Sequence, residues 1–137
     1  MPISAIDLDA ERAGLLAMHA AVRQAHFDTD PAGVVAYDAE EWINVRDGTV
    51  TVRHRAEDLQ MFTEYFAGAT YREWDDVEPP VVRVSDDASL AWLILHVHVH
   101  RTQGVEDLRF EYAGVETYEK REGRWLKVVE AGTFEIK

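Results

Sequence analysis

The stretch Trp92–His100, Trp-Leu-Ile-Leu-His-Val-His-Val-His, constrains the fold of this chain more than any other segment. Its side chains alternate with the two-residue period of a β-strand. One face carries the aliphatic residues Leu93, Leu95, Val97 and Val99, and the other carries Trp92, Ile94, His96, His98 and His100. The wall of a polar pocket needs titratable groups, whereas the second face of a core strand rarely does. We therefore expect the histidine face to line a pocket and the aliphatic face to point away from it.

The rest of the chain predicts helices first and a run of antiparallel strands afterwards. Apolar periodicity predicts helices over residues 9–27, 32–39 and 56–67, with Pro31 opening the second and Gly68 ending the third. Strands are expected over residues 41–45, 49–52, 71–77, 81–84, 92–100, 108–120 and 124–135, with a hairpin at Asp47-Gly48. This order is typical of an α+β fold in which helices pack on one face of a strongly curved antiparallel sheet and leave a cavity at its open end.

Composition limits the partners that the chain can have. Its 137 residues predict one domain spanning residues 1–137. A net charge of −12 without a basic patch argues against nucleic acid and against an anionic membrane surface. Cysteine is absent, which excludes disulfides and fits a cytoplasmic protein. The N-terminus, Met-Pro-Ile-Ser-Ala-Ile-Asp, has no basic or long apolar run, so neither a signal peptide nor a membrane span is expected.

The C-terminal part carries a resemblance to a known family. The tail over residues 110–129, and above all its turn Lys120-Arg-Glu-Gly-Arg-Trp125, resembles the closing hairpin of the SnoaL-like group. Ala39-Glu-Glu-Trp42 before the first strand is similar as well. That group belongs to the nuclear-transport-factor-2-like (NTF2-like, or cystatin-like) superfamily. The resemblance implies a cone-shaped α+β fold, in which N-terminal helices pack on a strongly curved antiparallel sheet around a concave pocket.

The resemblance also implies which side chains face the pocket. On its pattern, Ile94, His96 and His98 point inward from the central strand. Tyr112, Glu116 and Tyr118 do so from the next strand, and Val128 and Glu130 from the last. The aliphatic residues Leu93, Leu95, Val97 and Val99 then lie on the convex side. They would have to be covered by a second copy of the chain, so a homodimer through this face is expected.

Members of this superfamily include isomerases, polyketide cyclases, dehydratases, an epoxide hydrolase and many non-catalytic proteins, so the fold alone does not decide function. The aspartate base of the isomerase pattern falls on Arg46 here, and its helical tyrosine falls on Val22. Both departures argue against steroid isomerisation. The dehydratase pattern, with histidines and tyrosines on pocket strands, is loosely similar to His96, His98, Tyr112 and Tyr118 in this chain.

The candidate chemistry is proton transfer. His96 and His98, with Glu116 or Glu130 on neighbouring strands, could form a catalytic imidazole–carboxylate pair. The expected substrate-binding residues are His19, His26, Trp42, Phe62, Phe66, Trp92, Ile94, Tyr112 and Tyr118. His19 and His26 could equally be histidines at the edge of the core. A His-x-His strand can also seed a metal site, with His26 or a glutamate as third ligand, but we expect no metal and no cofactor.

We therefore expect a protein that binds a small, largely apolar molecule and acts as a lyase, isomerase or cyclase. The alternative is a non-catalytic ligand-binding domain or a structural dimerisation domain. All of the named sites depend on strand parity, because a shift of one residue turns every side chain to the other face.

Overall fold

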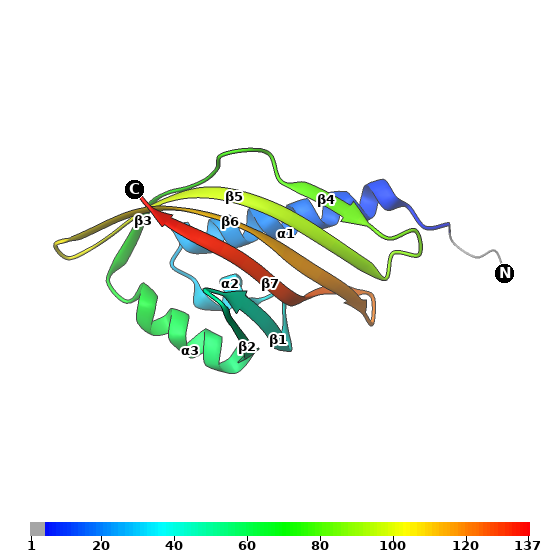
Figure 1. The fold of residues 1–137 in the computed structure, drawn as a ribbon, viewed down its shortest axis with the longest axis horizontal. Helices are drawn as coiled ribbons and strands as arrows, with labels where there is room; N and C mark the ends of the chain where they lie inside the picture. Colours follow the sequence, from blue (N-terminus) through cyan, green and yellow to red (C-terminus); the bar gives the residue numbers. More distant parts are fainter. Residues whose placement is uncertain (1–4) are drawn as a thin grey trace.

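The structure is a computed structural model that describes residues 5–137, so Met1–Ser4, part of the segment considered for a signal peptide, lie outside the described residues. Within residues 5–137 the chain forms three α-helices and seven β-strands (Figure 1). In chain order the elements are α1 (Leu8–Phe27), α2 (Pro31–Val35), β1 (Asp38–Arg46), β2 (Thr49–His54), α3 (Arg55–Phe66), β3 (Ala69–Asp76), β4 (Val81–Val84), β5 (Leu90–Gln103), β6 (Glu106–Arg121) and β7 (Arg124–Ile136).

The predicted elements are present, with one error in the second helix. That helix ends at Val35 and β1 begins at Asp38, so the expectation of helix as far as residue 39 is wrong. Pro31 does occupy the start of α2, as predicted. A helix this short gains little from its own hydrogen bonds, and the β-branched residues Val34 and Val35 favour it weakly. Pairing of Asp38 with Lys127 of β7 instead extends the strand to this point.

The strands form one seven-stranded sheet among the described residues, in the order β2-β1-β7-β6-β5-β3, with β4 also pairing with β5. The pairs are antiparallel except β1 and β7, which run parallel. This parallel pair corrects the expectation of a purely antiparallel sheet. The short turn at Glu122-Gly123 fixes β7 antiparallel to β6, and this hairpin rather than a connection to β1 sets the direction of β7.

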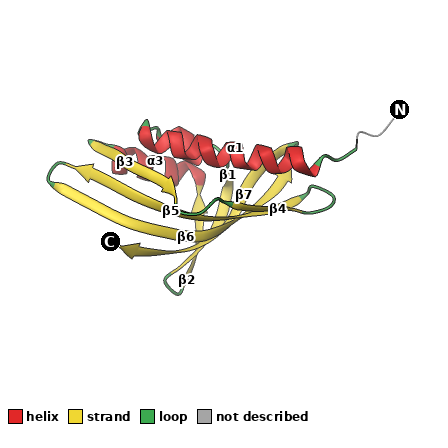
Figure 2. Cartoon of the chain, turned by 90° about the horizontal axis from the view of Figure 1, so that it is seen from above, coloured by secondary structure: helices red, strands yellow, loops and turns green. Residues whose placement is uncertain are grey.

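Helices α1 and α3 lie on one side of the twisted sheet, as Figure 2 shows. We call the side that they cover the inner face and the opposite side the outer face. The core forms on the inner face, where Leu15 of α1 and Phe66 of α3 share one apolar cluster with side chains of β3, β5, β6 and β7. The prediction of an α+β fold with helices packed on one face of a large sheet is confirmed.

The aliphatic face of β5 belongs to this core. Leu93, Leu95, Val97 and Val99 are 1%, 5%, 2% and 2% exposed and lie in the cluster with Leu15 and Phe66. The prediction that these four residues face a partner subunit is therefore wrong. Each aliphatic side chain gains about 1.5–3 kcal/mol when it is fully buried, so the uniformly apolar face is the one that packs against the helices.

Polar contacts at both ends of α1 fix this helix across the inner face. Near its start, Lys120 Nζ and Trp125 Nε1 both donate to the Glu11 carboxylate, at 2.6 and 2.7 Å. Near its end, Arg23 Nε donates to the carbonyl of Trp74 at 2.7 Å. The helix is therefore tied to β6 and β7 at one end and to β3 at the other.

Helix α3 is held from both sides by buried charged groups. The Asp58 carboxylate is 2% exposed, accepts a hydrogen bond from Trp42 Nε1 at 2.9 Å and pairs with the Arg53 guanidinium. At the other end of α3, Arg101 Nη2 donates to the carbonyl of Tyr65 at 2.7 Å, which places a cation where the helix dipole is negative.

None of the helices within residues 5–137 combines the length and the apolar character that crossing a bilayer requires.

Candidate active site on the inner face

The histidines of β5 lie on the outer face, opposite to their predicted position. His96 pairs with Ala113 and His98 with Glu111 across β5 and β6, and both side chains are about 30% exposed. His96 Nε2 lies 3.0 Å from Glu111 Oε1, and His98 Nε2 lies 3.0 Å from Glu73 Oε2. The prediction that these histidines line the inner pocket with Glu116 is wrong, because the aliphatic residues that alternate with them occupy the core.

Trp92 and Ile94 share this parity and lie on the outer face as well. Ile94 is 45% exposed and Trp92 is half-buried. Their predicted place beside an inner-face ligand is likewise wrong. The third histidine, His100, also lies on this face, and its Nε2 is 2.7 Å from Asp107 Oδ1.

The inner face carries a cluster of charged groups beyond the apolar core. Asp38 of β1, Glu116 of β6, and Lys127 and Glu130 of β7 make up what we call the inner-face ionic cluster. Lys127 Nζ donates to Glu130 Oε1 at 2.7 Å and lies 3.3 Å from Asp38 Oδ1. Glu116 and Glu130 are directly opposite each other in the β6–β7 pairing. Three carboxyl groups therefore surround one lysine.

A β-bulge in β7 produces this arrangement. Tyr118 pairs with Lys127 and Thr117 pairs with Val129, so Val128 is an extra residue in β7. Regular alternation would turn Lys127 and Glu130 to opposite faces, and the bulge brings both to the inner face. The sequence predicted that Val128 and Glu130 both point inward, because they are two residues apart. The structure corrects this prediction, since Lys127 rather than Val128 occupies the position that pairs with Tyr118.

The two facing glutamates differ in their affinity for a proton. Burial, followed by the nearby negative charge of Glu130, raises the pKa of Glu116 from 4.5 to about 7. Burial also opposes ionisation of Glu130, but the charge of Lys127 and hydrogen bonds from Lys127 and Tyr112 lower the pKa of Glu130 below its ordinary value. At neutral pH, Glu130 is thus the ionised member of the pair and Glu116 exchanges a proton.

The remaining members of the cluster follow the same electrostatic logic. Burial raises the pKa of Asp38 to about 6, although Lys127 opposes this shift. Burial disfavours the charge of Lys127, yet the surrounding Glu130, Asp38 and Glu116 raise its pKa above the ordinary value. Lys127 therefore stays protonated, and its Nζ also lies 3.9 Å from the centre of the Trp42 ring.

Two tyrosines donate hydrogen bonds to the glutamates. The Tyr118 hydroxyl donates to Glu116 Oε1 at 2.9 Å, and the Tyr112 hydroxyl donates to Glu130 Oε2 at 2.7 Å. Burial and the adjacent carboxylates raise the pKa of both phenols, so both remain neutral donors. Each carboxyl group in the facing pair thus has a tyrosine that orients it.

Glycines make room for Tyr112. Its ring lies over Gly114 and Gly132, so a Cβ atom on either glycine would collide with the Tyr112 side chain. Phe134 extends the aromatic surface, with its ring centroid 4.8 Å from that of Tyr112, and is 47% exposed. Exposure therefore rises along the inner face from the ionic cluster towards Phe134.

The other predicted binding residues lie nearer the helices. His26 packs among the rings of Phe62, Phe66 and Trp74, and burial lowers its pKa to about 4, so it is a neutral core histidine. His19 is 8% exposed and its Nε2 lies 2.8 Å from Asp76 Oδ1. These residues, and Trp42 with its bond to Asp58, are engaged in packing on the inner face.

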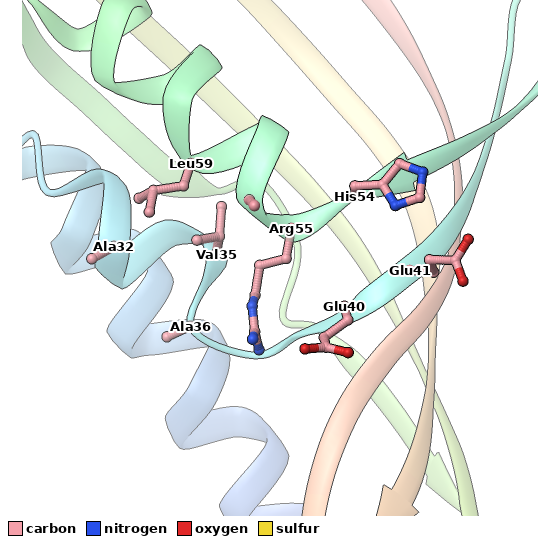
Figure 3. A pocket seen from close by; sticks show the side chains of 9 residues that line it. Ala32, Val35, Ala36, Glu40, Glu41, His54, Arg55 and Leu59 are labelled. Carbon is pink, nitrogen blue, oxygen red and sulfur yellow. The ribbon is translucent and has the colours of Figure 1, made fainter.

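Two surface grooves lie away from the ionic cluster. One, of about 790 Å³, lies between α2, the start of α3 and β1 (Figure 3), where Val35 and Leu59 form an apolar floor beside Arg55. The other, of about 540 Å³, lies beside the β1–β2 hairpin and is lined by Val45, Arg46, Ile94 and residues 113–115 and 131–133, among others. The first groove contains none of the residues predicted from the sequence.

Within residues 5–137, histidine, aspartate and glutamate side chains form no group of three or more that is arranged to hold a metal ion. The residues that sequence reasoning missed are Asp38 and Lys127. One signal for Lys127 was available, because a lysine two residues after Trp125 in an apolar strand shares the inward parity of that tryptophan. Asp38 was missed because its segment was expected to be helical.

Among comparisons with known proteins, the one with solved structures identifies the fold. A scan of the sequence against models of protein families finds no match, and a search of curated proteins finds none either. Solved structures do match. An NTF2-like protein of unknown function from Pseudomonas putida KT2440 is 13% identical, with a TM-score of 0.68, over 91% of this chain and 87% of its own.

Two further matches carry more specific names. A protein from Streptomyces avermitilis, provisionally named a dehydratase from the NTF2-like family, is 11% identical with a TM-score of 0.72 over 92% of this chain and 97% of its own. A domain from Xanthomonas campestris, provisionally named a calcium/calmodulin-dependent protein kinase II association domain, is 18% identical with a TM-score of 0.66 over 96% and 95%. The chain therefore has the NTF2-like fold, which confirms the predicted fold class.

Proposed function

We propose that this protein binds a small molecule with a largely apolar frame against the inner face of its sheet and transfers a proton on it, as a cofactor-independent lyase, isomerase or cyclase does. The observation that carries the proposal is Glu116, a half-buried carboxyl group whose pKa of about 7 lets it both accept and donate a proton near neutrality. The predicted catalytic role of Glu116 and Glu130 is kept, and that of His96 and His98 is not.

The proposed roles follow from the contacts. The carboxylate form of Glu116 removes a proton from a carbon or oxygen of the ligand, and the carboxyl form returns a proton at the same or a neighbouring atom. Tyr118 donates to Glu116 Oε1 and leaves the second oxygen for the ligand. Lys127 and Tyr112 keep Glu130 ionised, and this negative charge opposite Glu116 keeps the pKa of Glu116 high.

The class of reaction is also supported by one of the structural neighbours, the Streptomyces avermitilis protein provisionally named a dehydratase. Dehydration, isomerisation and cyclisation share one elementary step, the removal of a proton next to an electron-withdrawing group. One acid–base group of suitable pKa can serve any of these reactions.

The proposal can be tested by hydrogen–deuterium exchange on a simple ketone. Cyclohexanone incubated with the protein in D₂O at neutral pH should lose its α-proton signals in the NMR spectrum faster than in buffer alone. Glu116→Gln should abolish the acceleration. Glu111→Gln, on the outer face of the same strand, should leave it unchanged. Equal rates with and without the wild-type protein, across a panel of small apolar ketones, would contradict a catalytic role.

A second candidate function, a dimerisation domain, is favoured by an apolar row on the outer face. Val50, Val45, Ala131, Val115, Ile94 and Val81 are successive cross-strand partners along one line of the sheet. The side chains of Val50, Ile94 and Val81 are 69%, 45% and 48% exposed. Exposed apolar rows of this kind mark interaction sites, and one structural neighbour is provisionally named an association domain.

We infer that a second copy of the chain covers this row, in place of the aliphatic face of β5 that the sequence suggested. Sedimentation of the wild-type protein should then show a dimer, and Ile94→Glu should yield a folded monomer. Val105→Glu, at a fully exposed position in the β5–β6 turn, serves as the matched control and should leave the dimer intact. A wild-type monomer at micromolar concentration would contradict this second function and leave the catalytic proposal standing.

A further inference from the structure

Arg46, at the end of β1, has hydrogen-bonding capacity that the described part of the chain does not use. A guanidinium group carries five N–H donors. Arg46 Nε is buried and has no hydrogen-bond partner among residues 5–137. Its Nη2 lies 3.6 Å from Glu130 Oε2, which is longer than an ordinary N–H···O hydrogen bond. A buried donor without an acceptor is unfavourable, so a ligand that supplies the acceptor would bind here with a gain.

The nearby carboxylate does not need Arg46. Glu130 accepts from Lys127 through Oε1 and from Tyr112 through Oε2. Both of its oxygens are therefore occupied by closer donors than the guanidinium. Arg46 contributes positive charge to this part of the inner face, and its ion pair with Glu130, at 3.6 Å, is longer than the two hydrogen bonds that Glu130 already accepts.

Asn44 adds a second unused polar group. Asn44 pairs with Glu130 in the parallel β1–β7 register, so its side chain lies on the inner face. Arg46 follows it by two residues and therefore lies on the same face. Within the described residues its Oδ1 atom is buried and unpaired. Because a carboxamide can turn either its oxygen or its NH₂ group towards one point, Asn44 can also donate to an acceptor held by Arg46.

Aromatic rings give the site its apolar side. The Arg46 guanidinium carbon lies 4.5 Å from the centre of the Phe134 ring and 5.7 Å from that of Tyr112. These rings hold the guanidinium in place and present an apolar surface next to it. Phe134 is 47% exposed and the Arg46 side chain is 30% exposed, so a small molecule can reach both from solvent.

We propose that Arg46, assisted by Asn44, binds the carboxylate of a small ligand whose apolar part lies on Phe134 and Tyr112. The planar fork of a guanidinium matches the two oxygens of a carboxylate, and its charge strengthens both hydrogen bonds. This inference rests on the proposed function in one respect: the same ligand extends from Arg46 towards Glu116, where the proton is transferred. The substrate class is thus a carboxylic acid on an apolar frame.

Benzoate and benzyl alcohol test the inference as a matched pair of probes, because they share the ring and differ in the charged group. Titration calorimetry on the wild-type protein should give at least about tenfold tighter binding of benzoate, the effect expected of a charge-assisted pair. Arg46→Gln should reduce this preference to within about twofold. Arg46→Lys should keep part of it, since an ammonium retains the charge but lacks the fork. Arg109→Gln, at an exposed outer-face position, should change nothing.

A direct reading is available from the Arg46 Nε–H resonance, which should shift on addition of benzoate and be absent from the spectrum of Arg46→Lys. If Arg46→Gln does not fold, as judged by circular dichroism, the comparison of Arg46→Lys with the wild type decides. The inference is overturned if the wild-type protein binds the two probes equally, binds neither at millimolar concentration, or keeps its preference in a folded Arg46 variant.

Glu116→Gln separates this inference from the proposed function. It should abolish exchange on cyclohexanone and leave the benzoate preference intact. Exchange without a benzoate preference would overturn the role of Arg46 and keep the acid–base proposal. A benzoate preference without exchange on any ketone would keep the role of Arg46 and overturn the acid–base proposal.

Discussion

The two faces of the sheet hold charged groups in different ways. On the outer face, His96, His98 and Glu111 form pairs that are about 30% exposed. On the inner face, Lys127 and Glu130 are 10% and 14% exposed, and Lys127 donates one hydrogen bond of 2.7 Å to Glu130. Water screens the first set, whereas the second set depends on its protein partners for stabilisation. The buried charges of the inner face, rather than the exposed histidines of the outer face, are therefore the basis of the functional site that we propose.

The largest effect is expected from removing the positive charge of the inner-face ionic cluster. Lys127→Met leaves Asp38, Glu116 and Glu130 without their shared cation, and we expect a loss of about 3–5 kcal/mol in the free energy of unfolding. Denaturant titration measures this. Lys137→Met removes a 40% exposed lysine that pairs with Glu135 and Glu111, and should change stability by less than about 0.5 kcal/mol. Similar losses in the two variants would remove the distinction between the faces.

A smaller effect is expected from filling the space that Tyr112 occupies. Gly132→Ala places a methyl group against the Tyr112 ring and should cost about 2–3 kcal/mol, because the tyrosine must move and release Glu130. Gly14→Ala, in the middle of α1 with no atom near its Cβ position, should instead stabilise the protein by about 0.5–1 kcal/mol. Thermal unfolding of both variants gives the comparison, and a neutral Gly132→Ala would contradict the packing described for Tyr112.

The pH dependence of stability should distinguish Glu116 from outer-face acids. Its pKa is raised from 4.5 to about 7 in the folded state, so the folded protein binds more protons than the unfolded chain between these values. Stability contributed by this group therefore falls as pH rises through that window. Glu116→Gln removes this penalty. The difference in the free energy of unfolding between this variant and the wild type should therefore be about 1–3 kcal/mol more favourable to the variant at pH 8 than at pH 4. Glu111→Gln should keep the wild-type dependence of stability on pH. If this variant lost that dependence, the titrating group would be Glu111 and not Glu116.

The smallest effects are expected for the outer-face histidines. His96→Ala and His98→Ala remove partly exposed ion pairs and should each change the free energy of unfolding by less than about 1 kcal/mol. Exchange on cyclohexanone and binding of benzoate should be unaltered in both variants. If a stable histidine variant lost either the exchange on cyclohexanone or the binding of benzoate, the functional site would have to include the outer face.

Much of the fold could be predicted from the sequence because its signals are local. Helical periodicity, the Asp47-Gly48 turn and the Glu122-Gly123 turn each act over a few residues, and the elements that they predict are present. The pairing of β1 with β7 could not be predicted in this way, because it joins segments that are far apart in the chain and no local pattern encodes its direction.

The site was predicted less well because alternation defines two faces without saying which one is inside. The aliphatic row Leu93, Leu95, Val97 and Val99 is the more favourable one to bury. The histidines were nevertheless assigned to the pocket side, both because they are titratable and because the chain resembles pocket-forming proteins. A further signal was available. The two-residue turn at Gly104-Val105 sets Gln103 opposite Glu106, and counting outward from this turn sets Leu93 opposite Glu116. Glu116 therefore lies on the same face of the sheet as the aliphatic row and not on the face of the histidines.

The β7 bulge lies beyond such counting. Nothing in the order of Lys127, Val128, Val129 and Glu130 states where the extra residue falls, since a bulge arises from the packing of the whole sheet. Without it, Lys127 and Glu130 would lie on opposite faces and the ionic cluster would not form. Simple parity therefore could not reveal the group that holds the inner-face charges together.

An acid–base group on the inner face can be observed directly by a pH titration of the glutamate side-chain carboxyl carbons with ¹³C NMR, in which the Glu116→Gln spectrum assigns the Glu116 resonance. We expect one glutamate resonance, missing from the Glu116→Gln spectrum, whose midpoint lies near 7, while the pKa of the Glu130 carboxyl lies below its ordinary value. A spectrum in which the Glu116 resonance titrates with the ordinary midpoint near 4.5 would contradict the claim that the inner face holds an acid–base group active at neutral pH.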